Sequence, residues 1–98
     1  MHEIIYMKAD YEPWWLFEGW ENDIVSRKSF ESKKQAQLYF NEMNQELRQK
    51  YPFYAAKGDA FAAYWKEGET EYCRDCEEEL QIFHGLLWLI DGQPITNI

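Results

Sequence analysis

The chain contains little cysteine, proline and glycine, with two, three and five of these residues among 98. Two cysteines are too few for the disulfide framework that stabilises many small secreted domains. No apolar run approaches the roughly 20 residues of a membrane-spanning helix, and the run Leu86–Ile90 has five. The beginning, Met1-His2-Glu3, lacks the positive charge that is typical of a signal peptide. We therefore expect a cytoplasmic protein without a membrane span.

Positive charge is also scarce, because ten Lys and Arg residues stand against eighteen Asp and Glu, for a formal net charge of −8. Binding to nucleic-acid phosphates requires a local excess of cations, so this balance disfavours nucleic acid as a partner. Acidic residues are densest between Glu67 and Glu79, where seven acids accompany one base, Arg74. Such a run usually lies on a solvated loop or edge, and it also suits a cation or a basic protein partner.

Aromatic residues are plentiful, at 18% of the chain, and hydrophobic residues make up 46%. This composition excludes a disordered protein, because it supplies enough apolar surface to form a core. The length fits one compact domain, residues 1–98.

The clearest predicted element is a helix over about residues 32–50. Ser32 and Gln35 have the spacing of a capping box at its start, and Pro52 ends it by disfavouring helical geometry in the preceding residue. Apolar side chains recur at helical spacing along one face, at Ala36, Tyr39, Phe40, Met43 and Leu47.

Short apolar segments predict strands on both sides of this helix. The predicted strands cover residues 4–8, 24–30, 61–65, 70–73, 80–90 and about 93–98, and residues 55–59 are predicted to be a connection. We expect the strand at 70–73 to be the hairpin partner of the strand at 61–65. Asp91-Gly92 is typical of a hairpin turn, and Pro94 confines the last strand to an edge. Together the elements predict an α+β domain, in which a mostly antiparallel sheet of about five strands packs against one long amphipathic helix.

The segment 9–23 is rich in aromatic residues and is interrupted by proline and glycine, which predicts an ordered, aromatic-packed loop. Its candidate binding residues are Tyr11, Trp14, Trp15 and Trp20, which lie near Phe17 and several acids. Tryptophan and tyrosine are enriched at interface hot spots. We therefore expect a non-enzymatic module that binds a protein or peptide through this aromatic patch and an acidic surface. On this hypothesis at least two of the three tryptophans are substantially exposed; the alternative is that the rings only fill the core.

Cys73 and Cys76 form the one arrangement that resembles a reactive motif. Zinc takes four ligands in a tetrahedron, and a Cys-x-x-Cys pair supplies two of them. His84 lies eight residues after Cys76 and could provide a third, with His2 or a carboxylate completing the site. The set Cys73, Cys76 and His84 therefore predicts, as an alternative function, a small zinc-binding or thiol protein.

Other interpretations of the same residues remain open. The acidic neighbours raise the pKa of the thiols, which disfavours a redox-active dithiol, and the two cysteines can simply be reduced and inert. His84 lies in an apolar strand, so it can instead be a hydrogen-bonded core histidine.

A third function rests on the basic cluster Arg27, Lys28, Lys33 and Lys34, which could bind nucleic acid with help from a nearby tryptophan. Glu31 lies within this cluster, so a solvated face is the competing interpretation. The chain has no motif typical of a Ser-His-Asp triad, no glycine-rich phosphate loop and no His-Glu-x-x-His motif. We therefore expect no enzymatic activity.

Several short motifs follow one another in a familiar order along nearly the whole chain. They are Glu12-Pro13-Trp14-Trp15, Glu18-Gly19-Trp20-Glu21, Lys50-Tyr51-Pro52, Ala62-Ala63-Tyr64-Trp65, Cys73-x-x-Cys76 and Phe83-His84-Gly85-Leu86-Leu87. On these residues the chain resembles domain of unknown function family 1033, a family of small Gram-positive bacterial proteins. The resemblance implies no particular fold or activity. Gly85 departs from the serine that the resemblance leads us to expect, which puts any hydroxyl-based role at this position in doubt.

Overall fold

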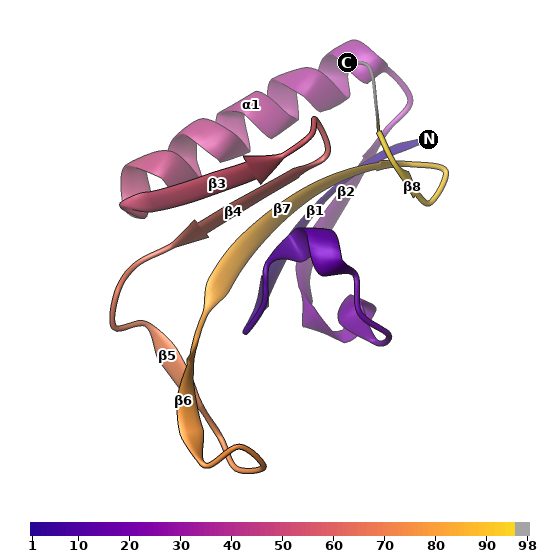
Figure 1. Cartoon of the computed structure of the whole chain (residues 1–98). Coiled ribbons are helices and arrows are strands. Elements are labelled where there is room, and N and C mark those ends of the chain that lie inside the picture. The colour runs from indigo at the N-terminus through magenta and orange to yellow at the C-terminus, as the bar shows by residue number, and fades with distance from the viewer. Residues whose placement is uncertain (96–98) are drawn as a thin grey trace.

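The computed structural model describes residues 1–95, which form an antiparallel sheet, one long helix and a projecting two-stranded ribbon (Figure 1). The sheet has six strands: β1 (His2–Ala9), β2 (Ile24–Phe30), β3 (Phe53–Lys57), β4 (Phe61–Trp65), β7 (Phe83–Ile90) and β8 (Gln93–Pro94). Its order is β2-β1-β7-β4-β3, with β8 also pairing with β7. The predicted α+β class is confirmed, with more strands than the five expected.

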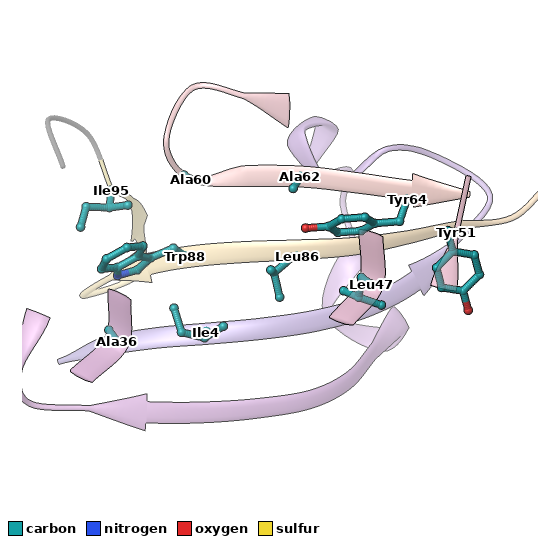
Figure 2. Packing of buried hydrophobic residues seen from close by; sticks show 10 residues of the cluster. All are labelled: Ile4, Ala36, Leu47, Tyr51, Ala60, Ala62, Tyr64, Leu86, Trp88 and Ile95. Carbon is teal, nitrogen blue, oxygen red and sulfur yellow. The ribbon is translucent and has the colours of Figure 1, made fainter. Parts of the chain in front are cut away.

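Helix α1 (Lys33–Lys50) covers one face of the sheet, which we call the helix face (Figure 1). The Ser32 hydroxyl caps the helix by accepting a hydrogen bond from the Gln35 backbone N–H at 3.3 Å. Ala36 and Leu47 are buried against the sheet, as the helical spacing predicts. The cluster between helix and sheet contains Ile4, Ala36, Leu47, Tyr51, Ala60, Ala62, Tyr64, Leu86, Trp88 and Ile95 (Figure 2).

The opposite side of the sheet, which we call the loop face, is covered by the segment between β1 and β2. This segment contains two short 3-10 turns, η1 (Pro13–Trp15) and η2 (Trp20–Asp23). They pack over a second cluster, formed by Ile5, Met7, Ala9, Leu87 and Leu89. Alternation along β1 and β7 sends neighbouring side chains to opposite faces, and because both faces are covered, both sets are mostly apolar. The predicted aromatic-packed loop is therefore the second layer of the core.

A row of small residues on the loop face lets η1 pack closely against the sheet. Ala55, Ala63 and Gly85 lie side by side on β3, β4 and β7. Pro13 is buried directly above Gly85, where an added β-carbon would lie 2.8 Å from the Pro13 Cβ. Glycine is therefore needed here for the close approach of η1 to the sheet.

Three strand predictions are wrong in their pairing or extent. Residues 53–57, which overlap the predicted connection, form β3, because β4 provides a complete antiparallel ladder for them. β5 (Thr70–Cys73) pairs with β6 (Glu78–Gln81) and not with β4, so these two strands form the separate ribbon. The single strand predicted at 80–90 is broken at Ile82, whose N–H donates to the Glu69 carbonyl at 2.9 Å.

The chain after β7 turns at Asp91 and Gly92, both in the left-handed region, with φ of 49° and 85°. This confirms the predicted hairpin turn. The last predicted strand is observed as β8, while residues 96–98 lie outside the described part of the chain. Within residues 1–95, no helix has the length and apolar character needed to cross a membrane.

Candidate functional site

The exposed aromatic residues of the segment between β1 and β2 form one continuous surface. Trp15 is 53% and Phe17 is 52% exposed. Their rings stack with centroids 6.0 Å apart and planes 5° from parallel. The half-buried ring of Tyr11 meets Phe17 edge-on at 5.0 Å. We call Tyr11, Trp15 and Phe17 the aromatic surface.

Polar contacts hold these rings in place. The Trp15 Nε1–H donates to the Glu12 carboxylate at 3.0 Å, and the Tyr11 hydroxyl donates to Asp23 at 2.7 Å. Burial and the hydrogen bond to Asp23 raise the pKa of Tyr11 well above its ordinary value, so its hydroxyl remains a proton donor at neutral pH. The Lys57 ammonium lies 5.7 Å from the Trp15 ring centre, within the range of a cation–π contact. These contacts hold the rings in fixed orientations.

Trp14 lines a pocket of about 360 Å³ beside this surface. The other lining residues come from the β3–β4 turn and the chain after β7, and are Lys57, Gly58, Asp59, Ala60, Phe61, Pro94 and Ile95. Lys57 belongs to both the pocket wall and the surroundings of Trp15, so the pocket adjoins the aromatic surface. Its walls are mostly apolar, which suits an inserted apolar side chain.

The four predicted binding residues differ in how far they contribute to the surface and how far they contribute to the core. Trp15 is exposed, Trp14 is half-buried at the pocket, and Trp20 is half-buried against the cluster that contains Ile5 and Leu87. The expectation that at least two of the three tryptophans are substantially exposed is therefore wrong. The physical reason is that the loop face of the sheet is apolar and needs a cover, and this segment supplies it. The sequence does not identify Lys57 as a neighbour of Trp15, because residues 55–59 are predicted to be a connection, whereas Lys57 lies on β3.

The two cysteines lie at the far end of the β5–β6 ribbon. Both are free thiols, and the Cys76 backbone N–H donates to the Cys73 sulfur at 3.3 Å. A hydrogen bond with the Cys73 side chain, followed by desolvation and by smaller contributions from Glu78 and Asp10, raises the pKa of the Cys76 thiol. This environment does not favour a reactive thiolate.

His84 is not brought to the cysteines. It lies on the helix face of β7, is 3% exposed, and has both ring nitrogens occupied. Nδ1 is 2.5 Å from the Tyr6 hydroxyl and Nε2 is 2.9 Å from the Glu69 carboxylate, while the Tyr51 ring stacks on the imidazole at 4.3 Å. This confirms the prediction of a hydrogen-bonded core histidine.

Burial, with smaller contributions from Tyr51 and Glu69, raises the pKa of Tyr6 to about 12. Glu69 lies within the acidic run, and the composition of that run does not indicate that one of its carboxylates turns inward to a histidine.

The second histidine, His2, is also buried and accepts a hydrogen bond from Trp88 Nε1 at 3.1 Å. Among residues 1–95, no group of three or more His, Cys, Asp or Glu side chains is arranged to hold a metal ion.

The predicted basic cluster is spread over two faces of the sheet. Arg27 lies opposite Ile5 on the loop face and pairs with the Glu3 carboxylate at 3.0 Å. Lys28 lies on the helix face, with its ammonium 4.9 Å from the Tyr39 ring centre. Lys33 and Lys34 begin helix α1. The four bases therefore do not present one surface to a nucleic-acid strand.

The family model described as Protein of unknown function (DUF1033) matches residues 1–98. No curated protein and no solved structure matches the chain.

Proposed function

The chain belongs to the DUF1033 family, and we propose that this member is a non-enzymatic module that binds a protein or peptide partner in the cytoplasm. The contact site in this proposal is the aromatic surface together with the pocket beside Trp14. The observation that carries it is the stacked pair Trp15–Phe17, each ring about half exposed and adjoining a pocket of about 360 Å³.

The exposed area of these rings provides the energy for association. An aromatic side chain has roughly 150–250 Å² to bury, and burial stabilises by roughly 25 cal/mol per Å². Trp15 and Phe17 leave about half of their surface in water. A partner that covers these rings therefore gains the free energy of burying apolar area that remains exposed after folding. The hydrogen bond from Trp15 to Glu12 lowers the entropy cost of association, because the indole is already held in one orientation.

Charge complementarity indicates the kind of partner. The segment that carries the aromatic surface also contains five acids, Asp10, Glu12, Glu18, Glu21 and Asp23, and the whole chain has a formal charge of −8. Lys57 supplies a single positive charge at the pocket wall. A segment that inserts an apolar side chain into the pocket and carries basic residues on either side fits this pattern.

Affinity capture with the tagged full chain tests the proposal. Trp15→Ala removes the exposed indole, and Leu38→Ala is the matched control, because Leu38 is 56% exposed on α1, across the sheet from the aromatic surface. We expect partners from cell extract to be retained by wild type and by Leu38→Ala, lost with Trp15→Ala, and released as salt rises. Equal capture by all three proteins would refute a role for the aromatic surface.

A further inference from the structure

The β5–β6 ribbon projects away from the sheet (Figure 1). The two cysteines lie at its far end, because β5 ends at Cys73 and β6 begins at Glu78. Its last register pair is Cys73 opposite Glu78, and the residues between them form the turn. Cys76 lies in this turn and is exposed, while Cys73 is partly exposed. The ribbon contributes no buried residue to either core cluster described above. Its length and position therefore need an explanation other than core packing.

The turn presents the two sulfurs as a pair. The Cys76 backbone N–H donates to the Cys73 sulfur at 3.3 Å, so the turn folds the second cysteine back toward the first. Glu77, directly after Cys76, takes a left-handed backbone with φ of 54°, which a non-glycine residue rarely adopts. The chain thus turns sharply after the second cysteine, so that both thiols lie at the end of the ribbon. Two cysteines separated by two residues are the unit from which structural zinc sites are built.

The ribbon supplies only half of such a site. Zinc prefers four ligands, and no third side chain in residues 1–95 joins the two cysteines in a metal-binding arrangement. Both histidines are buried in the sheet with hydrogen-bond partners of their own. Any further protein ligand must therefore come from another molecule.

We propose that Cys73 and Cys76 form a half-site for Zn²⁺, and that the same two cysteines of a second copy complete it. A tip-to-tip contact is accessible because the ribbon extends away from the sheet (Figure 1). Two copies related by a two-fold axis would supply four thiolates in a tetrahedron, a donor set that selects zinc over harder cations. This inference is independent of the aromatic surface.

The charges around the tip make this association depend on the ion. Each tip carries the acids Glu71, Asp75, Glu77, Glu78 and Glu79 against one base, Arg74. Two such tips repel each other, so the chains stay apart unless a cation lies between them. The same carboxylates attract divalent cations from solution. The expected result is a dimer that forms with zinc and separates when a chelator removes it.

The test uses the full chain, purified under reducing conditions, freed of metal and titrated with Zn²⁺. We expect one zinc ion per two chains by elemental analysis, and a doubling of mass by sedimentation that a chelator reverses. One zinc ion per monomer would refute the shared site, and no tight binding would refute the half-site itself.

Two variants identify the ligands. Cys76→Ser removes one thiolate and should abolish both zinc binding and the doubling of mass. Asp75→Asn removes a carboxylate between the two cysteines and should leave the stoichiometry unchanged. Circular dichroism checks that both variants are folded, which is expected because the ribbon lies outside the core clusters. Retained zinc binding in Cys76→Ser would show that the carboxylates hold the ion and would overturn the proposal.

Discussion

Gly85 lies directly beneath Pro13, so close that a β-carbon on Gly85 would be 2.8 Å from the Pro13 Cβ and 2.9 Å from the Met7 Cγ. This contact sets the distance between η1 and the sheet. Because Trp14 and Trp15 follow Pro13 in the same turn, their positions depend on the missing side chain at Gly85. One glycine in the central strand therefore positions the turn that carries Trp14 and Trp15.

Replacing Gly85 tests this relationship. Gly85→Ala should lower the free energy of unfolding by about 1–3 kcal/mol, because the added carbon overpacks the interface with Pro13. Gly85→Ser should cost a similar amount, since the clash comes from the β-carbon that both residues share. Urea unfolding followed by circular dichroism measures the change. Wild-type stability in either variant would mean that η1 can move away from the sheet without cost.

Trp15 and Trp88 should respond very differently to truncation. Trp88 is fully buried between helix and sheet, so Trp88→Ala should cost about 3–5 kcal/mol of stability. Trp15 is 53% exposed, so Trp15→Ala should cost less than about 1 kcal/mol. Thermal unfolding of the two variants against wild type makes the comparison. A large loss with Trp15→Ala would assign this ring to folding and would weaken its proposed role in binding.

Glu69 should stabilise the fold through His84. Glu69→Ala leaves the buried Nε2 of His84 without its partner, which should cost about 1–3 kcal/mol. The matched control is Glu67→Ala, two residues earlier, because this side chain is exposed and its loss should change stability by less than about 0.5 kcal/mol. Chemical denaturation of both variants at neutral pH provides the measurement. Equal stabilities would show that the contact with His84 contributes nothing.

Alkaline pH should destabilise the protein through Tyr6. Its pKa is raised from 10.0 to about 12 in the folded state, chiefly by burial. Between these values the unfolded chain releases the proton and the folded chain keeps it, so stability falls as pH rises through this window. Urea unfolding between pH 8 and about 11 should show this decline, with a smaller slope in Tyr6→Phe. An identical slope in the variant would assign the decline to other buried tyrosines, such as Tyr64, whose pKa is also raised by burial.

Local patterns were sufficient for the helix and for the main strands. Helix α1 follows Ser32 and buries Ala36 and Leu47, because helical spacing and capping depend on residues a few positions apart. Strands β1, β2, β4 and β7 occupy the predicted apolar segments. Strand β3 has a weaker signal, since Phe53 and Tyr54 favour a strand while the two alanines and Lys57 that follow do not. It is extended because β4 offers hydrogen-bond partners in register.

The sequence predicts the residue types of the candidate site but not which of these residues are exposed. The density of tryptophan and tyrosine between residues 11 and 20 indicated a special segment, but it could not tell which rings would be exposed. That depended on the apolar loop face, which required Trp20 as part of its cover. It also depended on Lys57, which reaches Trp15 from a strand more than forty residues away. The contact of Glu69 with His84 also could not be predicted from local patterns, because the two residues are fifteen positions apart in the sequence.

By itself, the sequence determined the α+β class, the helix and its buried face, the acidic character of the ribbon and the family to which the chain belongs. These properties depend on composition and on spacing between near neighbours. Only the tertiary structure decided that the aromatic segment is a second core layer, that Trp15 and Phe17 remain outside it, and that the cysteines are separated from His84. Those outcomes depend on which distant residues share a face of the sheet, and strand order and register set that pairing.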